Sequence, residues 1–461
     1  AIRSVSKPLK IDRQEIQTNF LHTWNVNEVK PGPGQQIEYY FQVTDNDGVL
    51  GPKSTRSAVK IFRVPTERET DLRLEKGSQA VKSKMEEAIR KAGQLEKEAK
   101  QLNQGLLEKK NLSYDEKKQI EQLLQKQKEL DNLVKEIQQE NKKNLIDRQE
   151  SKEQREEIME KQRQIDELFN NVLDEKTREI LKNIEKLLEQ NNKNMTRNEL
   201  SKMQMDNKSV QKELDRILEL YKQLEYDQKL TESIDKLNDM AQQQENLANQ
   251  TEQKNQDAQQ LKEQQEQLKK DFQDLKSDLK ELQQKNEELS NKNNFENPEK
   301  EQQQIDQQQN ESSKNLDRNN TKKASENQKN AAQQMRQMSK KLESAQEENE
   351  MKENQINEQQ LREILDNLVK TSFDQEKVMQ TLRGMNPSDP AYVGQAQKQK
   401  DIQDNLKLIE DSLYSLSKRV PQIEAVVTKE VQTINTNVTK ALESLSERRT
   451  AEANRSQQFA M

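Results

Sequence analysis

Few residues of this sequence have the type and spacing that enzymatic or metal chemistry requires. His22 is the only histidine, and the chain has no cysteine. A zinc site gathers several histidine, cysteine or carboxylate ligands around one ion, so a single histidine predicts no such site. His22 also has no identifiable nucleophile to serve as a general base. The sequence therefore predicts no catalytic residues, no metal and no cofactor, in a protein that is not an enzyme.

Asp45, Asp47 and Gly48 resemble part of a calcium-binding loop. A complete EF-hand loop has twelve residues and ends in a bidentate glutamate, which is absent here. A turn between two strands, with Gly48 free to take a positive φ, is the preferred interpretation. Calcium binding by Asp45 and Asp47 is the alternative that the sequence leaves open.

The least polar part of the long helical region is Leu214–Leu230. Aromatic and apolar side chains gather there among basic residues, which is typical either of several helices packing together or of a surface that receives a partner protein. A second candidate surface is the reversal expected near residues 291–300. The candidate partner-binding residues are Tyr221, Leu224, Tyr226, Phe295 and Pro298.

Composition limits the fold and the function. Of the 461 residues, 29% are apolar and 35% are charged, which is too little apolar material for one thick core. Narrow apolar stripes between helices need only two or three such residues per heptad. The net charge is −6 with the two signs interspersed, so we expect no nucleic-acid partner. No apolar run reaches the roughly 18 residues that a membrane span requires.

Residues 106–383 contain no glycine and one proline, Pro298. Glycine and proline cost about 1 and 3 kcal/mol in a helix interior, so this run predicts long helices. Thr66, Ser113 and Thr196 each have a glutamate three residues later, which predicts three capped helix starts. The fold class expected is mainly α: a long antiparallel coiled coil and helical bundle after a partial immunoglobulin-like β-sandwich.

The domains expected follow from these signals. Alternation over 36–43, and strand-like runs over 58–64 and 20–26, predict that residues 1–65 are the end of an immunoglobulin-like sandwich. The other predicted domains are a helical bundle segment at 66–195, a long antiparallel coiled-coil hairpin at 196–385 with its tip near 291–300, and C-terminal helices at 391–461 that pack on the bundle.

The hairpin prediction is specific about which residues face one another. A turn near residues 295–298 pairs Phe272 with Ala324 and Met240 with Ile356. Residues 291–330 are polar and low in complexity, and alone they are also typical of disorder. Asn286 interrupts a regular leucine stripe, where a buried asparagine can fix the register of a coiled coil.

Two passages resemble a large uncharacterised family of envelope proteins of Bacteroidota. They are the strand and turn Tyr39–Val49, continuing through Lys53–Ser57, and the helical segment Glu213–Glu225. The C-terminal segment Ala441–Arg449 is also similar. The resemblance implies N-terminal membrane helices, immunoglobulin-like domains and a long helical region. It therefore implies a periplasmic location and a membrane anchor in a segment that precedes this chain, and it transfers no catalytic residue.

Three functions are compatible with these observations. The leading hypothesis is a non-enzymatic periplasmic scaffold of the cell envelope that spans a distance and docks a partner. The alternatives are a chaperone-like or adaptor component of outer-membrane biogenesis or protein secretion, and a regulatory subunit of an envelope enzyme complex. The partners expected are other envelope proteins, such as an outer-membrane or secretion complex, or further copies of the chain in a homo-oligomer.

Overall fold

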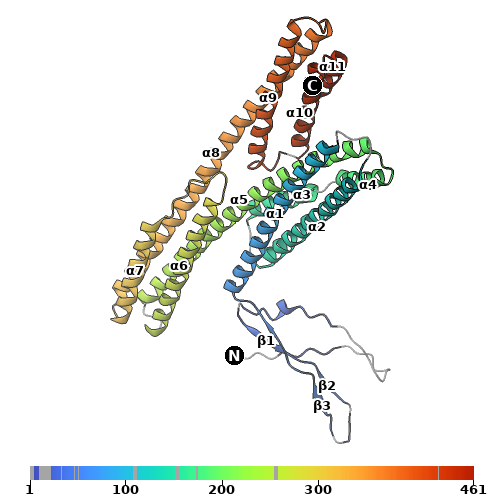
Figure 1. The fold of residues 1–461 in the computed structure, drawn as a ribbon. Helices are drawn as coiled ribbons and strands as arrows, with labels where there is room; N and C mark the ends of the chain where they lie inside the picture. The colour runs from blue at the N-terminus through green and yellow to red at the C-terminus, as the bar shows by residue number, and fades with distance from the viewer. Residues whose placement is uncertain are drawn as a thin grey trace. The chain divides into compact units, whose positions relative to one another are not determined.

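The computed structural model is mainly helical, with 81% helix and 3% strand (Figure 1). It divides into two compact units, Ala1–Gln79 and Ala80–Met461. The described residues are 5–9, 22–32, 34–45, 47–49, 51–106, 112–151, 155–172, 175–253, 258–423 and 425–461.

The first unit contains a two-stranded ribbon rather than a sandwich. β1 (Gln36–Tyr39) pairs antiparallel with β4 (Lys60–Arg63), and β2 (Gln42–Thr44) pairs with β3 (Ser54–Arg56). Three residues separate β3 from β4 but only two separate β1 from β2, so the ribbon has a one-residue bulge. The strands expected at 36–43 and 58–64 are therefore present in shortened form.

The expected sandwich is not seen among the described residues. The run expected as a strand at 20–26 lies partly outside them, and its described end passes into a 3₁₀ turn, η1 (Val26–Glu28). Within the described ranges, no second sheet covers the apolar side chains of the ribbon, and Val43, Ile61 and Phe62 are exposed. The alternating pattern predicted that strands are present, but it could not predict how many strands pair or whether a second sheet covers them.

The first hydrophobic core of the second unit forms around the N-terminal half of a very long helix. Lys84 bonds Glu136, and Lys126 bonds Glu98, so the first two helices run antiparallel. Ser113 and Glu116 exchange the two bonds of a capping box, as predicted. The helices of this core are α1 (Glu67–Gly105), α2 (Tyr114–Ser151), α3 (Glu156–Val172), α4 (Glu175–Glu189) and the first half of α5 (Lys193–Gln253).

The second core is a four-helix arrangement built on the other half of α5. α6 (Ala258–Glu287) folds back on α5, α7 (Glu299–Asp317) folds back on α6, and α8 (Thr321–Arg383) runs beside α5 and α7 (Figure 1). The third core joins the end of α8 to α9 (Ala391–Ser417), α10 (Ala425–Ser446) and α11 (Thr450–Ala460). The expected helix stop at residues 384–390 separates α8 from α9.

The long hairpin expected at 196–385 differs from the structure. α5 and α8 are antiparallel, but Asn238 lies opposite Glu343 rather than near residue 356. The expected tip at 291–300 lies beside the middle of α5, since Asn293 bonds Gln223 and Ser290 bonds Glu219.

The reason is two additional reversals that the sequence did not reveal: α6 folds back on α5, and α8 folds back on α7. α7 and α8 are joined by a turn in which Asn319 has a φ of 53° and the Asn320 side chain accepts a bond from the Lys323 backbone. Asparagine tolerates this left-handed conformation without a glycine or proline to mark it. Four shorter helices therefore share the core that two long arms were expected to form.

Two further expectations at helix ends changed. The Asn192 side chain, rather than that of Thr196, accepts a backbone bond at the start of α5, while the Thr196 hydroxyl bonds the Asn192 carbonyl. Asn286 does not pair with an opposing helix residue. It exchanges two bonds with the backbone of Asn293 and so holds the reversal after α6.

Candidate functional site

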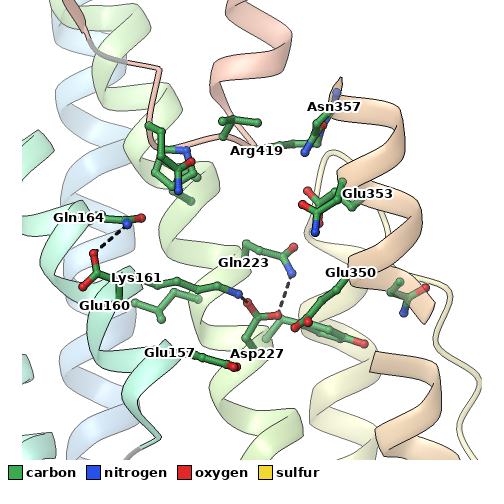
Figure 2. A pocket seen from close by; sticks show the side chains of 18 of the residues that line it. Glu157, Glu160, Lys161, Gln164, Gln223, Asp227, Glu350, Glu353, Asn357 and Arg419 are labelled. Carbon is green, nitrogen blue, oxygen red and sulfur yellow. Dashed lines mark hydrogen bonds and ion pairs between the residues drawn. The ribbon is translucent and has the colours of Figure 1, made fainter. Parts of the chain in front are cut away.

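A cleft of about 980 Å³ lies in the second unit. Its floor comes from α5, and its walls come from α3, from the middle of α8, and from the connection between α9 and α10 (Figure 2). α3 and α8 each pack against α5, and the cleft lies between them. The position follows from the length of α5, which supports one wall in the first core and the other in the second.

Apolar side chains form the floor of the cleft. Leu224 and Tyr226 of α5 are almost fully buried beneath it, and Ile165 and Leu361 contribute from the two walls. Phe295 packs edge-on against Tyr226, with ring centroids 6.3 Å apart. Burial and the nearby Asp227 raise the pKa of the Tyr226 hydroxyl, so the ring stays neutral.

The walls of the cleft carry more negative than positive charge. Seven carboxylates line it, against three basic side chains. The Lys161 ammonium lies 2.6 Å from Asp227. Burial, together with repulsion from the Asp227 and Glu350 carboxylates, raises the pKa of Glu353. The carboxylates are Glu156, Glu157, Glu160, Asp227, Glu350, Glu353 and Glu358, and the bases are Arg155, Lys161 and Arg419.

Hydrogen bonds orient several of the side chains that line the cleft. Within α5 the Gln223 amide donates to Asp227 over 2.9 Å, and within α3 Gln164 donates to Glu160 over 3.0 Å (Figure 2). Arg419 bonds Asn357 over 3.0 Å and also bonds Gln360, which joins the end of α9 to α8. The Arg419 bonds therefore connect two of the walls.

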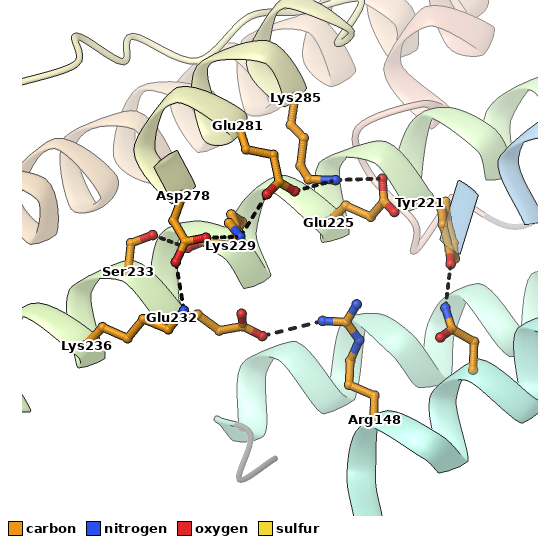
Figure 3. Close-up of polar contacts among 11 residues, drawn as sticks. Arg148, Tyr221, Glu225, Lys229, Glu232, Ser233, Lys236, Asp278, Glu281 and Lys285 are labelled. Atoms are coloured by element: carbon orange, nitrogen blue, oxygen red, sulfur yellow. Dashed lines mark hydrogen bonds and ion pairs between the residues drawn. The ribbon is translucent and has the colours of Figure 1, made fainter. Parts of the chain in front are cut away.

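The predicted partner-binding residues are distributed differently from the expectation. Leu224 and Tyr226 line the cleft, and Phe295 packs on Tyr226. Tyr221 points away, and its hydroxyl accepts a 3.2 Å bond from Asn144 of α2 (Figure 3). Pro298 is buried and starts α7. The acidic wall residues of α3 and α8 were missed, because glutamates on helices read as solvated faces until the fold brings them together.

A network of charged residues lies on the same helix as the cleft floor. Lys229 bonds Asp278 over 2.6 Å and Glu281 over 2.9 Å, and the Glu281 carboxylate also pairs with Lys285 (Figure 3). The nearly buried Lys82 pairs with Glu225 over 2.8 Å and so ties α1 to α5. Through these pairs of opposite charge, the network joins α1, α5 and α6.

The candidate calcium ligands act within the ribbon turn. An oxygen of Asp45 accepts from the Lys53 backbone at 2.7 Å, and Asp47 accepts from the Val49 backbone at 2.9 Å. His22 is exposed. Across the described ranges, histidine, cysteine and acidic side chains nowhere gather in threes around a possible metal position.

None of the helices in the described part of the chain combines the length and apolarity that a bilayer crossing demands. No protein-family model, no curated protein and no solved structure matches this chain.

Proposed function

We propose that this protein is a non-enzymatic scaffold of the cell envelope that spans a distance with long helices and docks a partner protein. The observation that carries the proposal is the continuity of α5 and α8. Each helix enters two hydrophobic cores without a break, α5 the first and second, and α8 the second and third. At 61 and 63 residues, each extends about 90 Å.

A helix that is shared by two cores holds them at a fixed distance. A flexible loop between the cores would let them move independently, whereas a continuous helix fixes their spacing. The periplasmic location belongs to the same proposal and rests on the resemblance to envelope proteins described above.

The rigid span can be measured directly, because the chain has no cysteine to interfere with labelling. Spin labels at Asn330→Cys and Lys370→Cys lie 40 residues apart on α8, so we expect a narrow distance distribution centred near 60 Å. A control pair, Lys370→Cys with Lys398→Cys, reports on the third core alone. A broad distance distribution, or one centred at a much shorter distance, for the first pair together with a narrow distribution for the control would contradict the proposal that α8 is a rigid spacer.

An adaptor role in outer-membrane biogenesis or secretion is the second candidate, and the cleft favours it. In-cell cross-linking from exposed positions along α8 separates the two roles. A scaffold is expected to cross-link to one constant envelope partner, and an adaptor to a changing set of unfolded clients. Cross-links to neither would leave the docking part of the proposal without support.

A further inference from the structure

The middle of α8 lacks the buried stripe that the rest of the helix has. Leu342 is the last buried residue of the second core and Ile364 is the first of the third, and no residue of 343–363 is buried between them. Met351, Ile356 and Leu361 are nevertheless apolar, and they are 59%, 52% and 42% exposed; of the three, Leu361 lines the cleft. A helical stretch of nearly six turns without a buried residue has a surface that a partner could cover.

One face of this stretch is a wall of the cleft. Glu350, Glu353, Asn357 and Leu361 follow one another at three- and four-residue spacing, and all four line it. This wall runs from residue 346 to 361, about 22 Å along the helix axis or four helical turns. The cleft is therefore long enough to hold a short helix lying on α5 between α3 and α8.

The chemistry of the cleft selects among occupants. The floor is apolar, and the walls carry seven carboxylates against three bases, one of which already pairs with Asp227. Nucleic acid and other anions are repelled by such walls. A helix with an apolar face flanked by lysine and arginine matches both the floor and the walls.

We propose that the cleft between α3, α5 and α8 binds a basic amphipathic helix of a partner protein. Leucine-like side chains of that helix contact the exposed Leu361 and lie over the buried Leu224 and Ile165, and its lysines and arginines face the carboxylates of α3 and α8. This inference rests on the proposed docking function and names the chemistry of the partner.

The test uses the full chain and three synthetic 16-residue peptides with blocked ends. One peptide places leucine and lysine at helical spacing, a second has the same composition in scrambled order, and a third has glutamate in place of lysine. Fluorescence anisotropy measures each affinity at 50 and 500 mM salt. We expect the leucine–lysine helix to bind at least tenfold tighter than either control peptide, and more weakly at high salt.

Matched variants locate the binding site. Glu350→Lys with Glu353→Lys is expected to weaken binding of the leucine–lysine helix at least tenfold. The control Glu348→Lys with Glu363→Lys changes the same charge at exposed α8 positions that do not line the cleft, and is expected to change affinity less than twofold. Leu361→Gln is expected to weaken binding severalfold. Its control, Leu408→Gln at an exposed position of α9, is expected to leave binding unchanged.

Two results would overturn the inference. Equal binding of the scrambled peptide, or equal losses in both glutamate pairs, would show only a general attraction between basic peptides and an acidic protein. Circular dichroism of each variant checks that the helices remain folded. Because these assays contain no native partner, they can fail while the cross-linking described above still finds one, in which case docking stands and only the cleft chemistry is wrong.

Discussion

At the scale of single residues, the most constrained side chain is Arg216 of α5. It is only 1% exposed, and its guanidinium donates over 2.9 Å to the carbonyls of Ser417 and Pro421 and also to that of Ile423. Its carboxylate partner is Glu213, 3.1 Å away. One arginine thus satisfies carbonyls at the end of α9 and holds the α9–α10 connection against α5.

Removing this side chain should loosen the third core from α5. Arg216→Ala leaves buried carbonyls and the Glu213 carboxylate without their donor, so we expect a loss of about 2–4 kcal/mol in the free energy of unfolding. Arg216→Lys keeps the charge but not the planar fork, and should recover only part of the loss. Urea denaturation measures both. The exposed Arg362→Ala is the control, with an expected change below about 0.5 kcal/mol. Equal effects at both positions would contradict this role.

The acidic wall of the cleft predicts a pH dependence. Burial, Asp227 and Glu350 raise the pKa of Glu353, so the folded chain holds this proton to higher pH than the unfolded chain does. The ionised carboxylate therefore lowers stability as pH rises through its raised pKa. Glu353→Gln should be more stable than the wild type at pH 7 by a few tenths of a kcal/mol, and equal to it near pH 3.

Thermal unfolding at several pH values checks this prediction. Glu348 serves as the matched control, because a hydrogen bond from Lys352 lowers the pKa of its carboxyl and so reverses the sign. Glu348→Gln should not stabilise the protein at pH 7. A stability gain for Glu353→Gln that persists unchanged at pH 3 would contradict the electrostatic explanation.

At the scale of elements, buried glutamines align the four helices of the second core. Gln244 of α5 and Gln265 of α6 exchange two bonds, Gln309 of α7 donates to Gln244, and Gln328 of α8 donates to Gln265. Each helix supplies one amide to the layer. A similar pair, Gln375 and Gln399, joins α8 to α9 in the third core. Such layers favour one register, because sliding any one of these helices along its axis would leave buried amides without hydrogen bonds.

The layer can be tested by comparing one substitution with four. Gln244→Leu leaves its partners buried without bonds and should cost about 1–3 kcal/mol. Leucine at all four glutamine positions removes the unsatisfied groups, so stability should recover while the register becomes less specific. Chemical denaturation gives the energies, and NMR line widths report the register. The exposed Gln264→Leu should be near neutral. If the variant with all four substitutions loses four times the unfolding free energy that Gln244→Leu loses, the glutamines do not act as one hydrogen-bonded layer.

At the scale of the whole second unit, the three cores differ in how they are joined. α5 has buried residues along nearly its whole length, whereas α8 has none between Leu342 and Ile364. The link through α8 therefore depends on helix propensity, on surface pairs such as Glu348 with Lys352, and on polar contacts such as Arg419 with Asn357.

This difference predicts a gradient in amide hydrogen exchange. Residues 343–363 should exchange faster than 324–342 and 364–382 of the same helix, because local opening there exposes little packed surface. Exchange mass spectrometry resolves the three segments, and addition of the leucine–lysine peptide should slow only the middle one. Uniform protection along α8 would contradict the prediction.

The sequence by itself determined the helical class, the apolar stripes, the stop after Arg383 and two capping boxes, Thr66 with Glu69 and Ser113 with Glu116. These depend on local spacing and on the cost of glycine and proline in helices. It also indicated strands at 36–43 and 58–64, but it assigned them to a sandwich, because alternation reveals neither strand partners nor the number of layers. α7 was missed because glutamine and serine, which bury in it through hydrogen bonds, carry no apolar signal.

Only the tertiary structure decided which stripes face one another. The return of α6 along α5 and the Asn319 turn between α7 and α8 placed the four helices side by side. That folding set the acidic residues of α3 and α8 on either side of Leu224 and Tyr226. Of the five candidate residues, Leu224 and Tyr226 line the cleft. Tyr221 lies one helical turn before Leu224 on α5, and its hydroxyl bonds Asn144 of α2 instead. Periodicity specifies a face on each helix, but many registers bury such faces nearly equally well, and the choice among them depends on contacts between residues far apart in the chain.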